Sequence, residues 1–243
     1  MNGGGREAAG RDTTNLGQKD LDTISVGTYG YDYQEWSGGF YDQDLPLKWR
    51  FLHYSNQFRA LMLPVGATAA FFAGRLPELV DDSDDGFRFI IETLATDAVS
   101  DRLHDGLAPL ARRVAGVVLC TRAQDISDPE RLAAQVAAVD RRWPVCLDPE
   151  DKRPDDYRKL ADFARARGFS LVWRPQTRPE RVDGGRLLIA RLPQAPLSRV
   201  REVVEAMAAW RTGDGHAGVF FDQVDTAPEN ARQCRIMAEL MGV

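Results

Sequence analysis

The sequence has no apolar run long enough to cross a membrane. Its longest apolar stretch, residues 60–74, is broken by Pro64 and two glycines and falls short of the roughly 20 residues that a membrane-spanning helix needs. Residues 1–22 are polar and rich in glycine, so they lack the apolar segment of a signal peptide and predict a disordered lead-in. We therefore expect no membrane partner.

Cysteine is scarce, and its pattern excludes a site of the zinc-finger kind. The three cysteines, Cys120, Cys146 and Cys234, lie in apolar surroundings without CxxC spacing, which is typical of reduced thiols in a cytoplasmic protein. Dense positive charge is also missing, because the 31 lysines and arginines are spread along a chain of net charge −5. We therefore expect no nucleic-acid partner.

Histidine is equally scarce. His53 and His104 fall in segments with helical patterns, and His216 precedes an apolar run, whereas barrel enzymes hold divalent ions with side chains at strand ends. We therefore assign no metal-binding residues, and a magnesium or manganese site made of carboxylates alone stays open as an alternative. The chain also has no glycine-rich nucleotide motif, so the sequence identifies no cofactor.

What the sequence does have is a regular series of short apolar runs separated by helical patterns. This alternation predicts βαβ units with a parallel sheet, and eight units in about this length predict a single-domain (β/α)8 TIM barrel over residues 23–243. We expect irregular second and sixth crossovers, since residues 174–185 contain two prolines and a Gly-Gly pair. The predicted strands cover residues 23–28, 59–63, 87–91, 116–120, 144–147, 170–173, 187–191 and 218–222.

Capping signals support the helices between these strands. Ser127 with Glu130 and Thr226 with Glu229 have the spacing of a capping box, which predicts that each serine or threonine begins a helix. Gly168 follows an amphipathic segment and is well suited to end that helix in the left-handed conformation.

Ligands bind to this fold at the C-terminal ends of the strands, so the strand ends supply the candidate site. Glu92, Asp148 and Asp222 are candidate catalytic acids or bases. The first strand ends with Thr28, Tyr29 and Tyr31, of which we select Thr28 and Tyr31 for ligand contact. The other selected ligand-binding residues are Arg122, Arg174 and Arg191, together with Trp36 and Tyr41 as aromatic walls of the pocket.

Both ends of the chain resemble a known family. The stretch VGTYGYDYQEWSGGFY, residues 26–41, and the stretch FFDQVDTAPENA, residues 220–231, are similar to the opening and closing signatures of the YecE-like family, domain of unknown function family 72. The resemblance covers residues 24–243 in order. It implies a TIM barrel with a pocket at its C-terminal mouth.

The chain also departs from that family. Met62 and Pro64 stand where the family has polar groups, Glu92 stands where it has a lysine, and Pro193 replaces its histidine after Arg191. The resemblance therefore implies a divergent member in which most polar pocket residues are replaced.

These observations predict a protein that binds a small polar or anionic ligand at the barrel mouth, and they leave open whether it is catalytically degenerate. One alternative is an enzyme of hydrolase or isomerase type that acts on a sugar-like or phosphorylated substrate. A second alternative is a non-catalytic scaffold for a protein partner, whose identity the sequence does not indicate. Whether the chain is an enzyme is open at this stage.

Overall fold

Eight parallel strands form the centre of the molecule. The structure is a computed structural model that describes residues 24–65, 76–95, 105–149, 153–210 and 215–243; the lead-in predicted for residues 1–22 lies outside this part. The sheet order is β6-β5-β4-β3-β2-β1-β8-β7. The strands are β1 (Ser25–Tyr29), β2 (Ala60–Leu63), β3 (Arg88–Leu94), β4 (Val114–Thr121), β5 (Val145–Pro149), β6 (Ser170–Leu171), β7 (Leu187–Leu192) and β8 (His216–Phe221).

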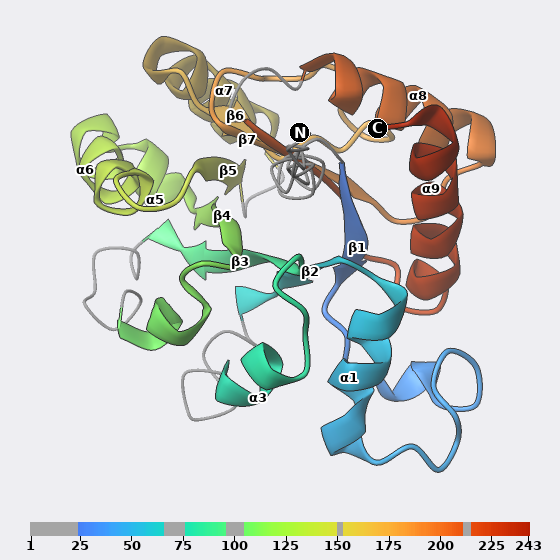
Figure 1. Ribbon diagram of the computed structural model, residues 1–243. Coiled ribbons are helices and arrows are strands. Elements are labelled where there is room, and N and C mark those ends of the chain that lie inside the picture. The colour runs from blue at the N-terminus through green and yellow to red at the C-terminus, as the bar shows by residue number, and fades with distance from the viewer. Residues whose placement is uncertain (1–23, 66–75, 96–104, 150–152, 211–214) are drawn as a thin grey trace, which may run out of the picture.

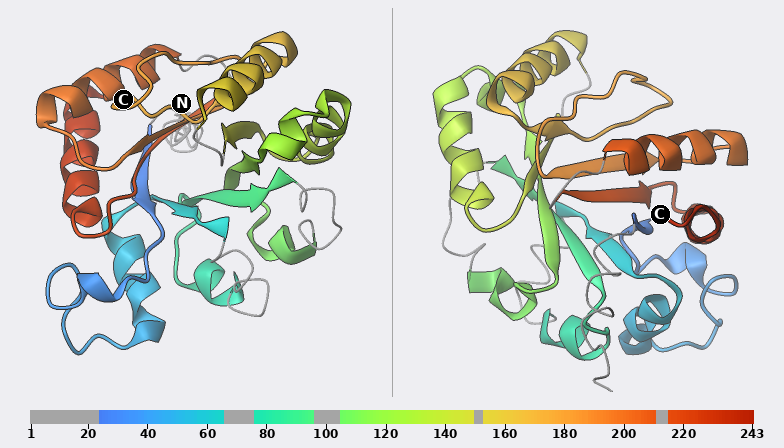
Figure 2. Two further views of the ribbon diagram at one scale, coloured as in Figure 1. Left: turned by 180° about the vertical axis from the view of Figure 1, so that it is seen from behind. Right: turned by 45° about the horizontal axis from the view of Figure 1, so that its top comes forward.

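Helices surround this sheet, as Figures 1 and 2 show. They are α1 (Leu47–Gln57), α3 (Leu76–Asp81), α5 (Ala123–Ile126), α6 (Pro129–Asp140), α7 (Pro154–Arg167), α8 (Leu197–Trp210) and α9 (Ala227–Met241), with short 3-10 turns η1 (Gln34–Trp36) and η3 (Ala108–Leu110). The predicted TIM barrel is confirmed. No helix among the described residues has the length and apolar character needed to cross a membrane.

The barrel closes between β6 and β7 through a single residue. The Trp173 amide donates to the Ile189 carbonyl at 2.8 Å, and the Arg191 amide donates to the Trp173 carbonyl at 2.9 Å. Beyond Trp173 the chain forms no helix before β7, which confirms the irregular sixth crossover. In the second crossover, the described part contains the six-residue helix α3.

Two apolar layers follow from the alternation of side chains along each strand. One lies inside the barrel and includes Met62, Ile90, Val118, Ile189 and Phe220. The other lies between the strands and the helices. The charged residues at the strand ends therefore rest on an apolar floor.

The helix ends confirm one capping prediction and correct another. Gly168 ends α7 in the left-handed conformation with φ of 73°. Helix α6 is capped by Asp128, whose carboxylate accepts from the Arg131 amide at 3.0 Å, and not by Ser127. Pro129 at the first helical position moves the start of α6 by one residue. Thr226 is the N-cap residue of α9, but its side chain makes no capping hydrogen bond.

Gly27 allows β1 to pack closely against β2, so we expect Gly27→Ala to destabilise the fold. An added Cβ would lie 2.1 Å from the Ala60 carbonyl oxygen and 2.8 Å from its carbonyl carbon, and backbone atoms cannot rotate away. Overpacking of this kind costs about 1–3 kcal/mol, occasionally more, so the unfolding free energy measured in urea should fall by about 3 kcal/mol.

The matched control is Gly39→Ala in the first βα loop. Its added Cβ would meet only the Trp36 carbonyl oxygen at 3.9 Å, so we expect a change within about 0.5 kcal/mol. Equal losses in both variants would contradict the role of Gly27.

Candidate functional site

A cavity of about 910 Å³ opens at the C-terminal ends of the strands. Its walls come from β1, β3, β4, β5 and β7, from the start of α7 and from the loop after β6. The polar and sulfur-bearing side chains that line it are Tyr29, Glu92, Cys120, Arg122, Asp148, Tyr157, Arg174, Thr177, Arg178 and Arg191. The cavity therefore lies where the fold predicts a ligand.

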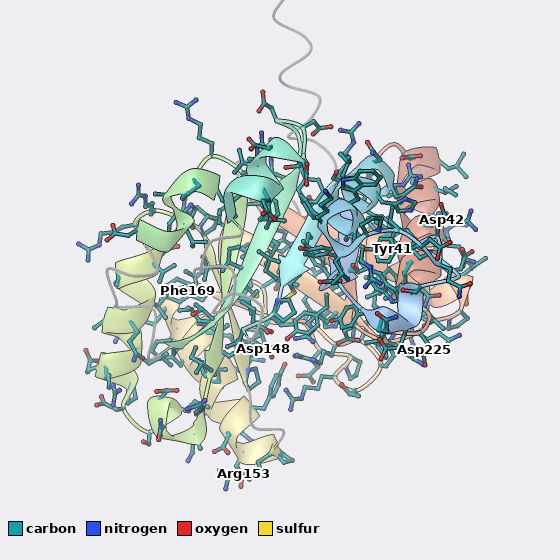
Figure 3. All side chains as sticks on the ribbon, turned by 90° about the horizontal axis from the view of Figure 1, so that it is seen from below. Tyr41, Asp42, Asp148, Arg153, Phe169 and Asp225 are labelled. Carbon is teal, nitrogen blue, oxygen red and sulfur yellow. The ribbon has the colours of Figure 1, made fainter. Side chains whose placement is uncertain are left out.

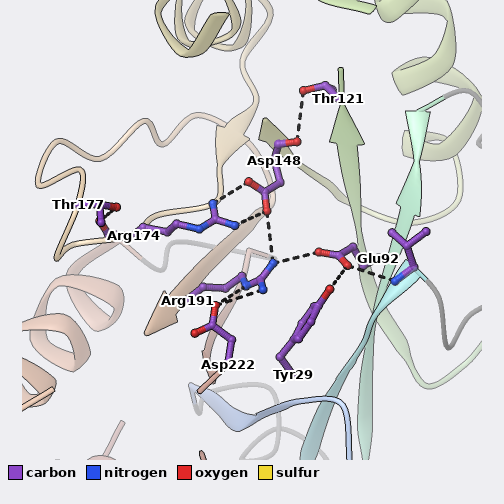
Figure 4. Close-up of polar contacts among 9 residues, drawn as sticks. Tyr29, Glu92, Thr121, Asp148, Arg174, Thr177, Arg191 and Asp222 are labelled. Carbon is purple, nitrogen blue, oxygen red and sulfur yellow. Dashed lines mark hydrogen bonds and ion pairs between the residues drawn. The ribbon is translucent and has the colours of Figure 1, made fainter. Parts of the chain in front are cut away.

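Arg191, near the end of β7, is the centre of the charged network. Its guanidinium contacts three carboxylates: Nη1 lies 3.1 Å from Glu92 and 3.5 Å from Asp148, while Nε and Nη2 each lie 3.2 Å from Asp222 Oδ2. Figure 4 shows the carboxylates arranged around it. The Arg191 side chain is only 12% exposed, so these ion pairs are shielded from solvent.

Tyr29 completes the support of this centre. The Arg191 guanidinium carbon lies 4.0 Å from the Tyr29 ring centroid, a cation–π contact, and the Tyr29 hydroxyl donates to Glu92 Oε2. The same Glu92 oxygen accepts from the Val65 amide at 3.2 Å. Burial and the neighbouring Glu92 carboxylate raise the pKa of Tyr29, so the phenol stays a hydrogen-bond donor.

Asp148 holds a second arginine. Arg174 donates to both of its oxygens, at 2.7 Å from Nη1 and 2.6 Å from Nη2. Burial by itself would lower the pKa of Arg174, but the hydrogen bonds to Asp148 and the negative charges of Asp148, Asp222 and Glu92 together outweigh it, so the pKa is raised. A bidentate pair of this kind fixes both side chains.

Asp222 differs from the other two carboxylates. Its Oδ2 accepts from Arg191, whereas its Oδ1 has no partner among the described residues, and the side chain is 23% exposed. A carboxylate that is held by one oxygen and has the other oxygen unpaired can accept a proton, or a hydrogen bond from a hydroxyl group.

The set of Glu92, Cys120 and Asp148 places three potential metal ligands within 4.8 Å of one another. The two carboxylates already bind Arg191 and Arg174, and burial raises the pKa of the Cys120 thiol. A divalent cation would have to displace Arg191 and deprotonate that thiol. This donor set therefore fits a guanidinium better than a metal ion.

The structure brings most predicted site residues together. Glu92, Asp148, Asp222, Arg174 and Arg191 form the charged network, and Arg122 lines the same cavity. The pairing of Arg174 with Asp148 and the central position of Arg191 are not evident from the sequence.

The prediction that Thr28 contacts a ligand is wrong, since its side chain is fully buried and does not reach the cavity. Its hydroxyl donates to the Gly30 carbonyl at 2.6 Å and lies 3.0 Å from the Tyr54 hydroxyl of α1. Successive side chains of a strand point to opposite faces, so Tyr29 points into the barrel and Thr28 toward the helices. Tyr29, not Thr28, is the first strand's contribution to the cavity.

Tyr31, Trp36 and Tyr41 also do not form walls of this cavity. They are 2%, 2% and 0% exposed and pack in an aromatic cluster with α1, where the Tyr31 and Phe51 ring centroids are 5.2 Å apart. The Tyr41 hydroxyl donates to the Tyr31 carbonyl at 2.5 Å. Figure 3 shows Tyr41 well apart from Asp148.

Trp36 is anchored on the other side of the first loop. Its indole NH donates to the Val224 carbonyl at 2.6 Å, and it borders a smaller cavity of about 490 Å³ beside α9. The Tyr41 hydroxyl therefore ties the first βα loop to its own backbone, and the Trp36 indole ties the same loop to the loop after β8.

Arg178 and Tyr157 are cavity residues that the sequence analysis does not select. Both lie in segments that follow a predicted strand, Tyr157 in α7 and Arg178 in the loop after β6. The sequence signal that indicates Arg178 is the composition of residues 174–185, because its two prolines and Gly-Gly pair predict an irregular loop at the mouth.

Of the comparisons with known proteins, the one with solved structures identifies the fold. No protein-family model and no curated protein matches the sequence. Among solved structures, a DUF72 family protein of Enterococcus faecalis is 14% identical with a TM-score of 0.65, and covers 89% of this chain and 95% of its own. A DUF72 family protein of Thermotoga maritima is 16% identical with a TM-score of 0.62, over 89% and 99%. The chain therefore has the fold of DUF72 proteins, as the resemblance of its two ends implies.

Arg191 neutralises buried carboxylates, so Arg191→Met should destabilise the fold strongly at neutral pH. Removing one partner of a buried ion pair costs about 3–5 kcal/mol. The uncompensated carboxylates of the variant would hold protons more tightly when folded than when unfolded, so its stability falls as pH rises. We expect urea unfolding to show a smaller deficit at pH 5 than at pH 7.

Arg186→Met is the matched control, because Arg186 pairs with Asp140 at 3.2 Å on the surface with both side chains at least 36% exposed. Such a pair contributes about 0–1 kcal/mol. A deficit for Arg191→Met that equals the control, or that does not change with pH, would argue against the network.

Proposed function

We propose that the chain binds a small, polar, negatively charged molecule in the cavity at the barrel mouth. The observation that carries this proposal is the charge of the lining. Among the described residues, four arginines line the cavity, Arg122, Arg174, Arg178 and Arg191, against two carboxylates, Glu92 and Asp148. The formal charge of this described lining is 4 − 2 = +2, or +1 when Asp222, which contacts Arg191, is added.

The polar side chains at the floor of the cavity can form hydrogen bonds with hydroxyl groups of a ligand. These polar groups are fixed to one another by the contacts of Arg191 and Arg174 before any ligand binds, and fixed polar groups lower the cost of ordering a site on binding. A molecule that combines hydroxyl groups with an anionic group, such as a sugar phosphate or a sugar acid, matches both parts of the cavity.

Filling the cavity should abolish binding. Leu94 is partly exposed at the cavity wall, so Leu94→Trp adds an indole ring where the ligand would lie. We expect at least one anion from a panel of sugar phosphates and sugar acids to raise the melting temperature of the full chain through linkage, and the variant to lose this response.

Leu240→Trp is the control, since Leu240 is 84% exposed on α9 and the same substitution there leaves the cavity unchanged. The matching neutral sugars form a second comparison. Equal stabilisation by neutral sugars, or an undiminished response in Leu94→Trp, would overturn the proposal.

A second candidate function is catalysis of the hydrolase or isomerase type. The Oδ1 of Asp222 favours it, because Arg191 orients this carboxylate through Oδ2 while Oδ1 has no hydrogen-bond partner among the described residues. Glu92 and Asp148 are weaker candidates, since each accepts hydrogen bonds at both oxygens.

If the chain is an enzyme, Asp222→Asn should remove turnover and retain binding. A positioned acid or base contributes about 10²–10⁴-fold to rate, and asparagine keeps an oxygen for Arg191. Chromogenic phosphate esters and glycosides provide the assay, and Asp225→Asn in the same exposed loop is the control. Full activity of Asp222→Asn, or no activity of the unmodified chain on any of these substrates, would argue against this function.

We further propose a reducing, cytoplasm-like compartment. Cys120, Cys146 and Cys234 are free and buried, and burial raises the pKa of each thiol. Buried neutral thiols of this kind are typical of cytoplasmic proteins.

A further inference from the structure

Arg178 differs from Arg174 and Arg191, the two arginines at the floor of the cavity. Arg191 directs Nε, Nη1 and Nη2 to carboxylates, and Arg174 directs both terminal nitrogens to Asp148. The charge of each of these two guanidinium groups is therefore already balanced by carboxylates. Arg178 is partly buried in the cavity wall and has no carboxylate partner among the described residues.

The Arg178 guanidinium rests on an aromatic ring. Its central carbon lies 3.9 Å from the ring centroid of Tyr157, a residue of α7 that lines the same cavity. A guanidinium is planar and carries its donors around its edge, so contact with a ring leaves those donors available for an oxyanion. The ring thus orients the group without neutralising its charge.

The loop that carries Arg178 is held in place by hydrogen bonds. The amides of Thr177 and Arg178 donate to the Arg174 carbonyl at 3.1 and 2.8 Å, and the Trp173 indole NH donates to the Pro179 carbonyl at 3.2 Å. Arg174 is itself fixed by Asp148. The position of Arg178 is therefore set by the same network that forms the floor.

We propose that Arg178, supported by Tyr157, recognises the oxyanion group of the ligand, a phosphate or a carboxylate, at the rim of the cavity. This inference rests on the proposed function and deepens it by assigning the anionic end of the ligand to the loop after β6. The hydroxyl-bearing part then faces Tyr29 and Glu92, which line the same cavity. Bidentate contact with two anion oxygens is the geometry that a guanidinium favours.

The test is calorimetric titration of the full chain with inorganic phosphate and, in parallel, with acetate. We expect Arg178→Gln to weaken binding of the preferred anion at least tenfold, because a charge-assisted pair is lost. The affinity of Arg178→Lys should lie between those of the unmodified chain and Arg178→Gln, since a lysine keeps the charge but not the planar fork of donors. Tyr157→Leu should also weaken binding, because the guanidinium loses its support.

Arg158→Gln is the matched control, since Arg158 is exposed on α7 beside Tyr157 and pairs with Asp155. It should change affinity less than twofold, and circular dichroism verifies that each variant is folded. If Arg178→Gln binds within twofold of the unmodified chain while Leu94→Trp does not bind, the anion lies elsewhere in the mouth and this inference fails alone. If neither variant affects binding, both this inference and the proposed function fail. If the unmodified chain binds neither anion, this inference is overturned.

Discussion

The buried guanidinium of Arg191 is the interaction on which the mouth of the barrel depends. It connects β7 to the carboxylates of Glu92 on β3, Asp148 on β5 and Asp222 after β8, and it rests on the Tyr29 ring from β1. Ion pairs strengthen as the surroundings become less polar, and the layer beneath them is the apolar interior around Met62, Ile90 and Phe220. The same desolvation makes each of these charges costly without its partners. The five side chains therefore form one unit.

Asp148 of this unit, through its contact with Arg174, also stabilises the closure of the barrel. Strand β6 has only two residues, and the connection to β7 depends on the two backbone hydrogen bonds of Trp173. The next residue, Arg174, reaches back to Asp148 on β5. Side-chain ion pairing thus stabilises the region where the strand ladder is shortest, and the helix-free loop that follows becomes a wall of the cavity.

The architecture could be predicted from the sequence because it depends on local pattern. Alternating apolar runs and helical segments identified the eight strands, and the strand ends identified Glu92, Asp148, Arg174, Arg191 and Asp222. The errors have a different origin. Thr28 was chosen over Tyr29 because a strand assigned only to within a residue or two does not fix which side chain points inward. The pairing of arginines with carboxylates could not be predicted, since it depends on distances across the barrel between residues up to 99 positions apart.

The aromatic first loop shows why composition alone misplaced part of the pocket. Its rings are predicted to surround a ligand, yet they pack on one another and on α1. The Tyr41 ring centroid lies 5.2 Å from the guanidinium of Arg50, which is 5% exposed and donates to Asp32 at 3.0 Å and to Ser37 at 2.7 Å. Large rings with glycines between them suit the packing of a compact loop as well as the wall of a cavity. Since the rings of this loop are occupied by their own contacts, we place the proposed ligand contacts in another part of the mouth. There α7 and the loop after β6 present Tyr157, Thr177 and Arg178 to the cavity, above a charged floor whose arginines are already paired.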